Sequence, residues 1–237
     1  MTNIDDRKIF CALDLLSNLS EEVRYEKICQ LSDSQKKKYK KLLENFKSLH
    51  NNSKKSSKNS QKLKGEALEN LVSYLLEISG GIFRVDRNLR TGTNEIDQMI
   101  SLNTKGKFLW TYNIINKKLD VFLGECKNYS KSVSVTYIGK FCSLLLTNNV
   151  KLGIMFSYYG ISGSGWKNGA GLVKKFYLHK EKMEDRYCII DFSINEFERI
   201  LNGENLLQII EEQLKSLQLD TDYSKYLSKH PAECQKD

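Results

Sequence analysis

Apolar residues recur at helical spacing over residues 4–50, between charged positions. Their spacing fits helices with one buried face, and they are Leu15, Leu16, Leu19, Val23, Ile28, Leu31, Leu42, Leu43 and Phe46. The stretch 51–64, NNSKKSSKNSQKLK, has almost nothing to bury, which predicts a flexible basic linker or a frayed helix end. We therefore expect an N-terminal helical region over 1–50, joined to the main domain by the linker.

Helix and strand patterns alternate over residues 65–219. A helix through Leu68 to Leu76 stops at Gly80-Gly81, and four strand-like runs follow: IFRV, NEIDQMISL, KFLWTYNII and LDVFLGEC. Next come a helix from VTYIGKF, a buried strand KLGIMFSYY, a short helix, a strand CIIDF, and two helices, the first with a capping box at Ser193 and Glu196. This order predicts an α/β fold with a mixed central sheet flanked by helices, followed by a polar tail at 220–237.

The chain carries 37 Lys and Arg against 29 Asp and Glu, with a net charge of +8 and an isoelectric point near 9.0. A basic excess favours an anionic partner such as nucleic acid without establishing one. The run KKKYKK at 36–41 lies on a predicted helix, where a solvated face is the more ordinary interpretation than a dedicated DNA contact.

Six cysteines are scattered without a Cys-x-x-Cys pair, which favours a reducing, cytoplasmic compartment and no zinc site. The acidic amino terminus, with its apolar run interrupted by Asp14, does not resemble a secretory signal. No apolar stretch reaches the roughly 18 residues that span a bilayer, so we expect no membrane association.

Three carboxylates and one lysine carry the candidate chemistry. Residues two apart on a strand share a face, so Glu125 and Lys127 project together while Cys126 turns into the packing. Asp97 is a second acid in an otherwise apolar strand, and such acids are costly to bury unless a cation compensates them. Mg²⁺ takes carboxylate and carbonyl oxygens, so Asp97 and Glu125, with the Cys126 backbone carbonyl as a third donor, predict a Mg²⁺ site that Mn²⁺ can also fill.

Lys127 beside such a metal would orient or deprotonate an attacking water and stabilise charge at phosphorus. Glu69 would reach in from the helix to hold a metal-bound water or a second ion, with Glu66 one turn earlier as its substitute. Taken singly, Glu69 is most often a surface carboxylate, and Glu125 with Lys127 an ordinary ion pair on an edge strand. Together, and in this order, they favour metal-dependent phosphodiester cleavage.

The segments GEALENLVSYLL, NEID and GECKNYS, with the helix and strand that follow, resemble the restriction-endonuclease-like PD-(D/E)xK nucleases, and most of all their Mrr-type branch. The resemblance covers roughly residues 65–200. It implies Mg²⁺-dependent DNA cleavage, with Glu69 as the helix glutamate, Asp97 as the motif aspartate and Glu125 with Lys127 as the E-x-K pair. Two departures are the absence of proline before Asp97 and the 27 residues, 98–124, that separate Asp97 from Glu125. Those residues must form a long hairpin or an excursion that leaves the acids adjacent.

We therefore expect a cytoplasmic, Mg²⁺-dependent DNA endonuclease that serves restriction or anti-phage defence. A resolvase-like or repair nuclease with the same site is the close alternative, and a catalytically inactive nucleic-acid-binding protein of the same fold is the second. A structural protein that binds a partner through its amino-terminal helices is the third. Double-strand cutting needs two sites, so a homodimer is expected, and an activator or partner protein is compatible with a defence role. The sequence does not assign the DNA-binding residues.

Overall fold

The computed structural model describes residues 14–16, 18–51, 58–90, 95–163 and 168–219, together with Lys8 and Cys11. The predicted polar tail at 220–237 lies outside the described residues. The helices are α2 (Glu21–Ile28), α3 (Asp33–Asn51), α4 (Lys58–Ile78), α5 (Thr104–Thr111), α6 (Val135–Thr147), α7 (Gly169–Leu178), α8 (Ile194–Leu201) and α9 (Leu206–Leu219), with short 3-10 turns η1 (Lys117–Leu119) and η2 (Met183–Asp185). The strands are β1 (Phe83–Arg90), β2 (Glu95–Leu102), β3 (Val121–Lys127), β4 (Leu152–Ser157) and β5 (Cys188–Phe192).

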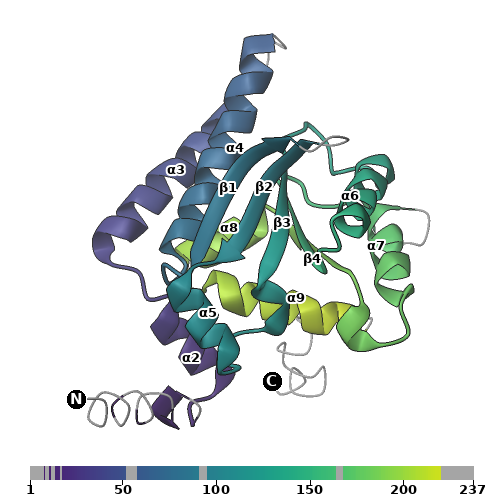
Figure 1. Ribbon diagram of the computed structural model, residues 1–237. Coiled ribbons are helices and arrows are strands. Elements are labelled where there is room, and N and C mark those ends of the chain that lie inside the picture. The colour runs from purple at the N-terminus through teal and green to yellow at the C-terminus, as the bar shows by residue number, and fades with distance from the viewer. Residues whose placement is uncertain are drawn as a thin grey trace, which may run out of the picture.

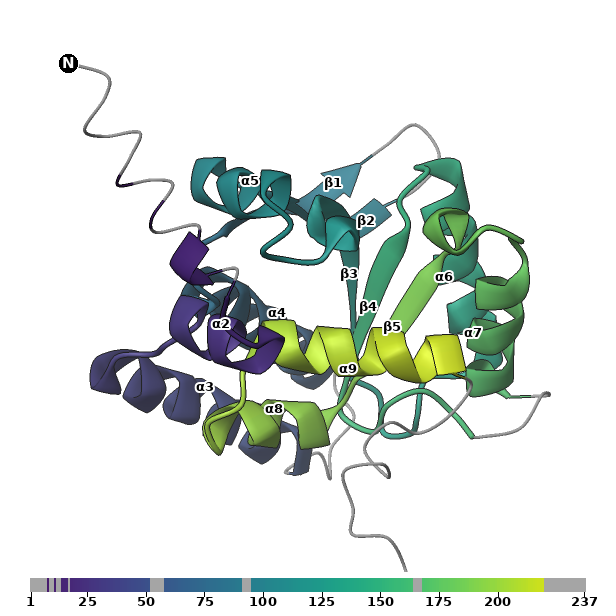
Figure 2. The ribbon, with the colours of Figure 1, turned by 90° about the horizontal axis from the view of Figure 1, so that it is seen from below.

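The five strands form one sheet in the order β1-β2-β3-β4-β5. The pairs β1–β2 and β2–β3 are antiparallel, whereas β3–β4 and β4–β5 are parallel, which confirms the predicted mixed sheet. Figure 1 shows the sheet between the helices, and Figure 2 shows α6 and α7 on one side of it, with α3, α4 and α8 on the other. Because β3, β4 and β5 are parallel, their carboxyl ends lie at one edge of the sheet.

Side-chain alternation along the strands divides the core into two clusters. On β4, Leu152, Ile154 and Phe156 join the larger cluster under α4 and α9, while Met155 joins the smaller cluster under α6 and α7. Strands buried on both faces read as continuous apolar runs, which is why LGIMFS carries no polar alternation. The capping box predicted at Ser193 and Glu196 is present at the start of α8.

The amino-terminal helices share the larger core. Tyr25 on α2 and Tyr39 and Phe46 on α3 are at most 3% exposed, and the Tyr39 hydroxyl donates to the Phe197 carbonyl at 2.9 Å. Residues 58–64 of the predicted linker form the first turns of α4, while 52–57 lie outside the described residues. The helical extension is thus packed onto the α/β layers over its described length.

The strand predicted at KFLWTYNII is wrong, because residues 104–111 form α5. The Asn103 side chain caps this helix by accepting from the Gly106 amide at 3.1 Å. Gly106 and Leu109, three residues apart, are buried, while Phe108 and Tyr112 are 40% and 48% exposed. The aromatic residues that suggest a strand therefore lie on the solvent face of a short helix.

None of the helices in the described part of the chain combines the length and apolarity that a membrane crossing requires. The cysteines that the structure describes, Cys11, Cys29, Cys126, Cys142 and Cys188, are free thiols.

Candidate active site

Asp97, Glu125 and Lys127 meet where β2 and β3 lie side by side. The antiparallel register pairs Gln98 with Gly124, so that Asp97 lies next to the end of β3. Asp97 Oδ2 accepts hydrogen bonds from the Cys126 amide and from Lys127 Nζ, both at 3.1 Å, and Lys127 Nζ lies 2.6 Å from Glu125 Oε1. One ammonium thus bridges two carboxylates. The 27-residue excursion, which contains α5 and η1, leaves the two acids adjacent.

The cluster is mostly shielded from solvent, with side-chain exposures of 23% for Asp97, 17% for Glu125 and 19% for Lys127. Burial alone would lower the pKa of Lys127, but the charges of Glu125 and Asp97 and their hydrogen bonds outweigh it and raise that pKa above its ordinary value. Lys127 is consequently a firmly held cation at neutral pH. This state suits the stabilisation of negative charge and does not suit the abstraction of a proton.

Glu69, on α4, is half-buried near the cluster. Burial and the charge of Asp97 raise its pKa, while Arg87 and Lys127 lower it. Glu66, the alternative considered from the sequence, is 48% exposed and lies 3.7 Å from Lys62 of the same helix. The charge of Asp97 therefore acts on Glu69, which is the better shielded of the two helix carboxylates.

A local change of strand facing brings Asp97 to this position. In the pairing of β1 with β2, Arg87 lies opposite Gln98 and Leu89 lies opposite Ile96. Asn88, between Arg87 and Leu89, has a φ of 50°. Leu89 and Ile96 pack in the smaller cluster. Phe83 and Val85 of β1 and Ile100 and Leu102 of β2, which an unbroken alternation would place on the same face as Leu89 and Ile96, pack in the larger one. Asparagine tolerates this left-handed conformation better than most residues, so the sequence permits the kink beside Asp97.

The residue after Lys127 is held by a buried histidine that the sequence analysis missed. His50 Nδ1 lies 2.7 Å from Asn128 Oδ1, and the Asn128 amide nitrogen donates to the Lys64 carbonyl at 3.0 Å. His50 is 6% exposed, and its ring stacks on Tyr158 with centroids 3.6 Å apart. This network ties α3 and α4 to the end of β3.

The histidine could have been found from helical spacing. His50 lies four residues after Phe46 on the buried face of α3, so it occupies a position where an apolar residue is expected. Burial lowers the pKa of His50, and the ring is therefore neutral at pH 7. Because Asn128 already donates through its nitrogen, its oxygen accepts the hydrogen bond and His50 Nδ1 carries the proton.

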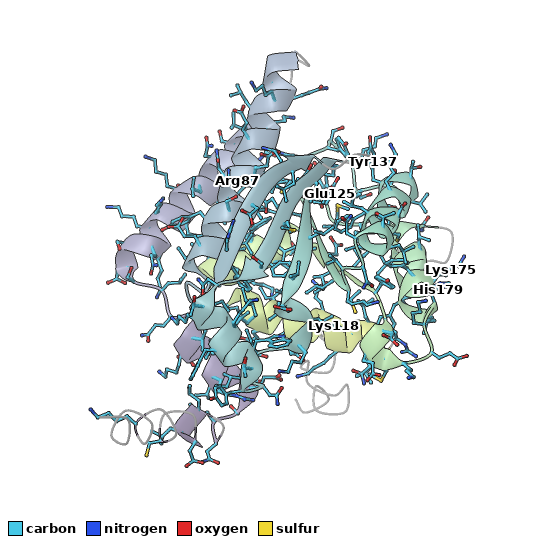
Figure 3. All side chains as sticks on the ribbon, viewed as in Figure 1. Arg87, Lys118, Glu125, Tyr137, Lys175 and His179 are labelled. Carbon is cyan, nitrogen blue, oxygen red and sulfur yellow. The ribbon has the colours of Figure 1, made fainter. Side chains whose placement is uncertain are left out.

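A groove of about 470 Å³ opens beside the cluster, between the first turns of α4 and the end of β3. Among the described residues, its lining includes Lys64, Lys127, Asn128 and Tyr129 and holds no aspartate or glutamate. In Figure 3, Glu125 lies at the same end of the sheet as Tyr137, whereas Lys118 lies at the opposite end.

The donors present suit a hard divalent cation. Asp97 and Glu125 offer two carboxylates, which is the number that a Mg²⁺ site commonly takes from protein, with waters completing the octahedron. The Cys126 amide is already bonded to Asp97, and its side chain packs against the larger core cluster, as predicted. Within the described ranges, no group of three or more His, Cys, Asp or Glu side chains has the arrangement of a metal site. A bound cation would therefore share the two carboxylates with Lys127.

Comparison with protein-family models, with curated proteins and with solved structures finds no match to this chain.

Proposed function

We propose that this protein is a Mg²⁺-dependent DNA endonuclease of the restriction-endonuclease-like, PD-(D/E)xK class, related to its Mrr-type branch. The observation that carries the proposal is the convergence of Asp97, Glu125 and Lys127 at one point of a mixed sheet. The resemblance stated from the sequence assigns these residues to the site, and the contacts among them support that assignment. The coupling of Glu69 to Asp97 adds the helix glutamate.

The roles follow from the charges. A bound Mg²⁺ would polarise the scissile phosphate and lower the pKa of a coordinated water. Asp97 and Glu125 would hold the cation, and the Lys127 ammonium would stabilise the charge that develops at phosphorus as water adds and a phosphorus–oxygen ester bond breaks. Glu69, whose pKa is raised by burial and by the charge of Asp97, is suited to accept the proton from the attacking water. The proton that the departing oxygen needs would come from solvent.

The test is incubation of the purified protein with supercoiled and linear DNA in Mg²⁺, in Mn²⁺ and in chelator. We expect nicking in both metals and none in chelator, and loss of nicking in Asp97→Asn and Lys127→Ala. Asp120→Asn is the matched control, because Asp120 directly precedes β3 at its opposite end and should leave nicking unchanged. Cleavage that survives in both site variants would refute the assignment.

Biological role and assembly are part of the same proposal. If the protein serves restriction or anti-phage defence in the cytoplasm, it should cut linear or modified duplex DNA. A resolvase or repair nuclease would prefer branched DNA. Binding of DNA without cleavage in either metal would favour the inactive binding protein. A homodimer is expected if duplex breaks are made, and light scattering tests it. An activator or partner protein would appear as cleavage that depends on an added cell fraction.

A further inference from the structure

A pair of tyrosines, Tyr129 exposed and Tyr137 half-buried, lies beside the cluster. Tyr129, two residues after Lys127, is 39% exposed, and its ring centroid lies 5.0 Å from that of Tyr137 in the first turn of α6, with the planes at 38°. Lys140 places its ammonium 5.6 Å from the Tyr137 ring. The pair is thus an aromatic surface with a positive charge next to it.

The groove at the site leads onto this surface. Tyr129 lines the groove, and the described lining residues also contribute the two cations Lys64 and Lys127 and several neutral polar side chains. Lys64 can therefore pair with a backbone phosphate of a strand in the groove, while the ammonium of Lys127 is already paired with Asp97 and Glu125. Because Tyr129 itself lines the groove, a base of such a strand can reach its ring.

We propose that Tyr129 and Tyr137 form a stacking platform for an unpaired base, and that the protein therefore prefers DNA that contains a single strand or a frayed end. A base within a duplex is already stacked on both faces, so it can lie on a tyrosine ring only after it leaves its neighbours. Aromatic rings in positively charged grooves are the usual means of holding single-stranded nucleic acid without reading its sequence. This inference rests on the proposed function for cleavage, but the binding step can be measured separately.

The chain contains a matched control for the aromatic pair. Phe108 and Tyr112 on α5 are also exposed, and their centroids lie 4.9 Å apart with the planes at 55°. This second pair has the same chemistry as the first, but α5 lies at the opposite end of the sheet from the cluster (Figure 1). A general effect of exposed aromatic residues on affinity would appear at both pairs, and an effect of the platform would appear only at Tyr129.

The experiment compares Tyr129→Ala, Tyr129→Phe and Tyr112→Ala with the parent protein. The dissociation constants for a labelled single-stranded oligonucleotide and for the duplex of the same sequence are measured by fluorescence anisotropy in chelator, so that cleavage does not interfere. Thermal melting of each variant checks that it is folded. We expect Tyr129→Ala to bind the single strand roughly tenfold more weakly, since stacking on one ring commonly contributes that much. Duplex binding should change less than twofold, and Tyr129→Phe and Tyr112→Ala should match the parent.

The outcomes separate this inference from the proposed function. Unchanged single-strand affinity in Tyr129→Ala, or equal losses on the single strand and the duplex, would overturn the stacking platform. A selective loss would support it even if no metal-dependent cleavage is found, in which case the endonuclease proposal alone fails. Normal metal-dependent cleavage together with equal losses of affinity on the single strand and the duplex would overturn the stacking platform and leave the endonuclease proposal standing.

Discussion

Replacing Lys127 by methionine removes the one ammonium that bridges Asp97 and Glu125 while keeping a side chain of similar length. Unit charges about 3 Å apart attract by about 5 kcal/mol at an effective dielectric constant of about 20, before the cost of burying them. Exposed pairs contribute about 0–1 kcal/mol, and breaking a buried pair costs about 3–5 kcal/mol. With all three side chains about a fifth exposed, we expect the free energy of unfolding to fall by about 2–3 kcal/mol at pH 7.

The pH dependence follows from the raised pKa of Lys127. A lysine whose folded-state pKa lies above its unfolded value of about 10.5 contributes stability that is fully present below that pH and is lost as pH rises through the folded value. The difference between the parent and Lys127→Met should therefore be constant from pH 7 to about pH 10 and decrease above it. The assay is urea denaturation at several pH values, followed by tryptophan fluorescence.

Two controls make the result interpretable. Lys131→Met removes an exposed lysine four residues further along, and surface changes of this kind usually stay within about 0.5 kcal/mol. Mg²⁺ should restore part of the stability of Lys127→Met and raise its melting temperature more than that of the parent, because a divalent cation can replace the missing charge between the carboxylates. Equal stability of the parent and Lys127→Met at pH 7 would refute the electrostatic reasoning about the cluster.

Two further predictions concern the surroundings of the site. His50→Gln should make the stability less sensitive to acid. A histidine whose folded-state pKa is lowered by burial contributes stability that is present above its unfolded pKa of about 6.5 and is lost as pH falls. Denaturation curves at pH 7.5 and 5.5 should therefore differ less for the variant than for the parent. Gly160→Ala should lower the free energy of unfolding by at least about 2 kcal/mol, and Gly81→Ala by about 1 kcal/mol. Both glycines have positive φ, but only a Cβ at Gly160 would meet Asp191 Oδ2, at 2.7 Å. Equal losses of stability in calorimetry would contradict this reasoning.

Much of the fold could be predicted because its signals are local. The continuous apolar run of β4, the capping box of α8 and the spacing of Leu68, Leu71 and Leu75 each depend on neighbours a few residues away. The same holds for the E-x-K pair, whose shared facing follows from strand geometry alone. The prediction failed at α5, because a short aromatic run fits either a strand or a helix. The helix packs Gly106 against the Ile82 carbonyl, and the run by itself does not reveal this contact with a distant residue.

The sequence by itself determined which side chains are candidates for chemistry and that a mixed sheet carries them. Only the tertiary structure decided that Asp97 bonds the Cys126 amide and Lys127, that the charge of Asp97 acts on Glu69, and that His50 holds Asn128. These contacts join residues 28 to 78 positions apart along the chain. Their geometry depends on strand register and on the packing of α3 and α4, and neither is encoded in a local pattern.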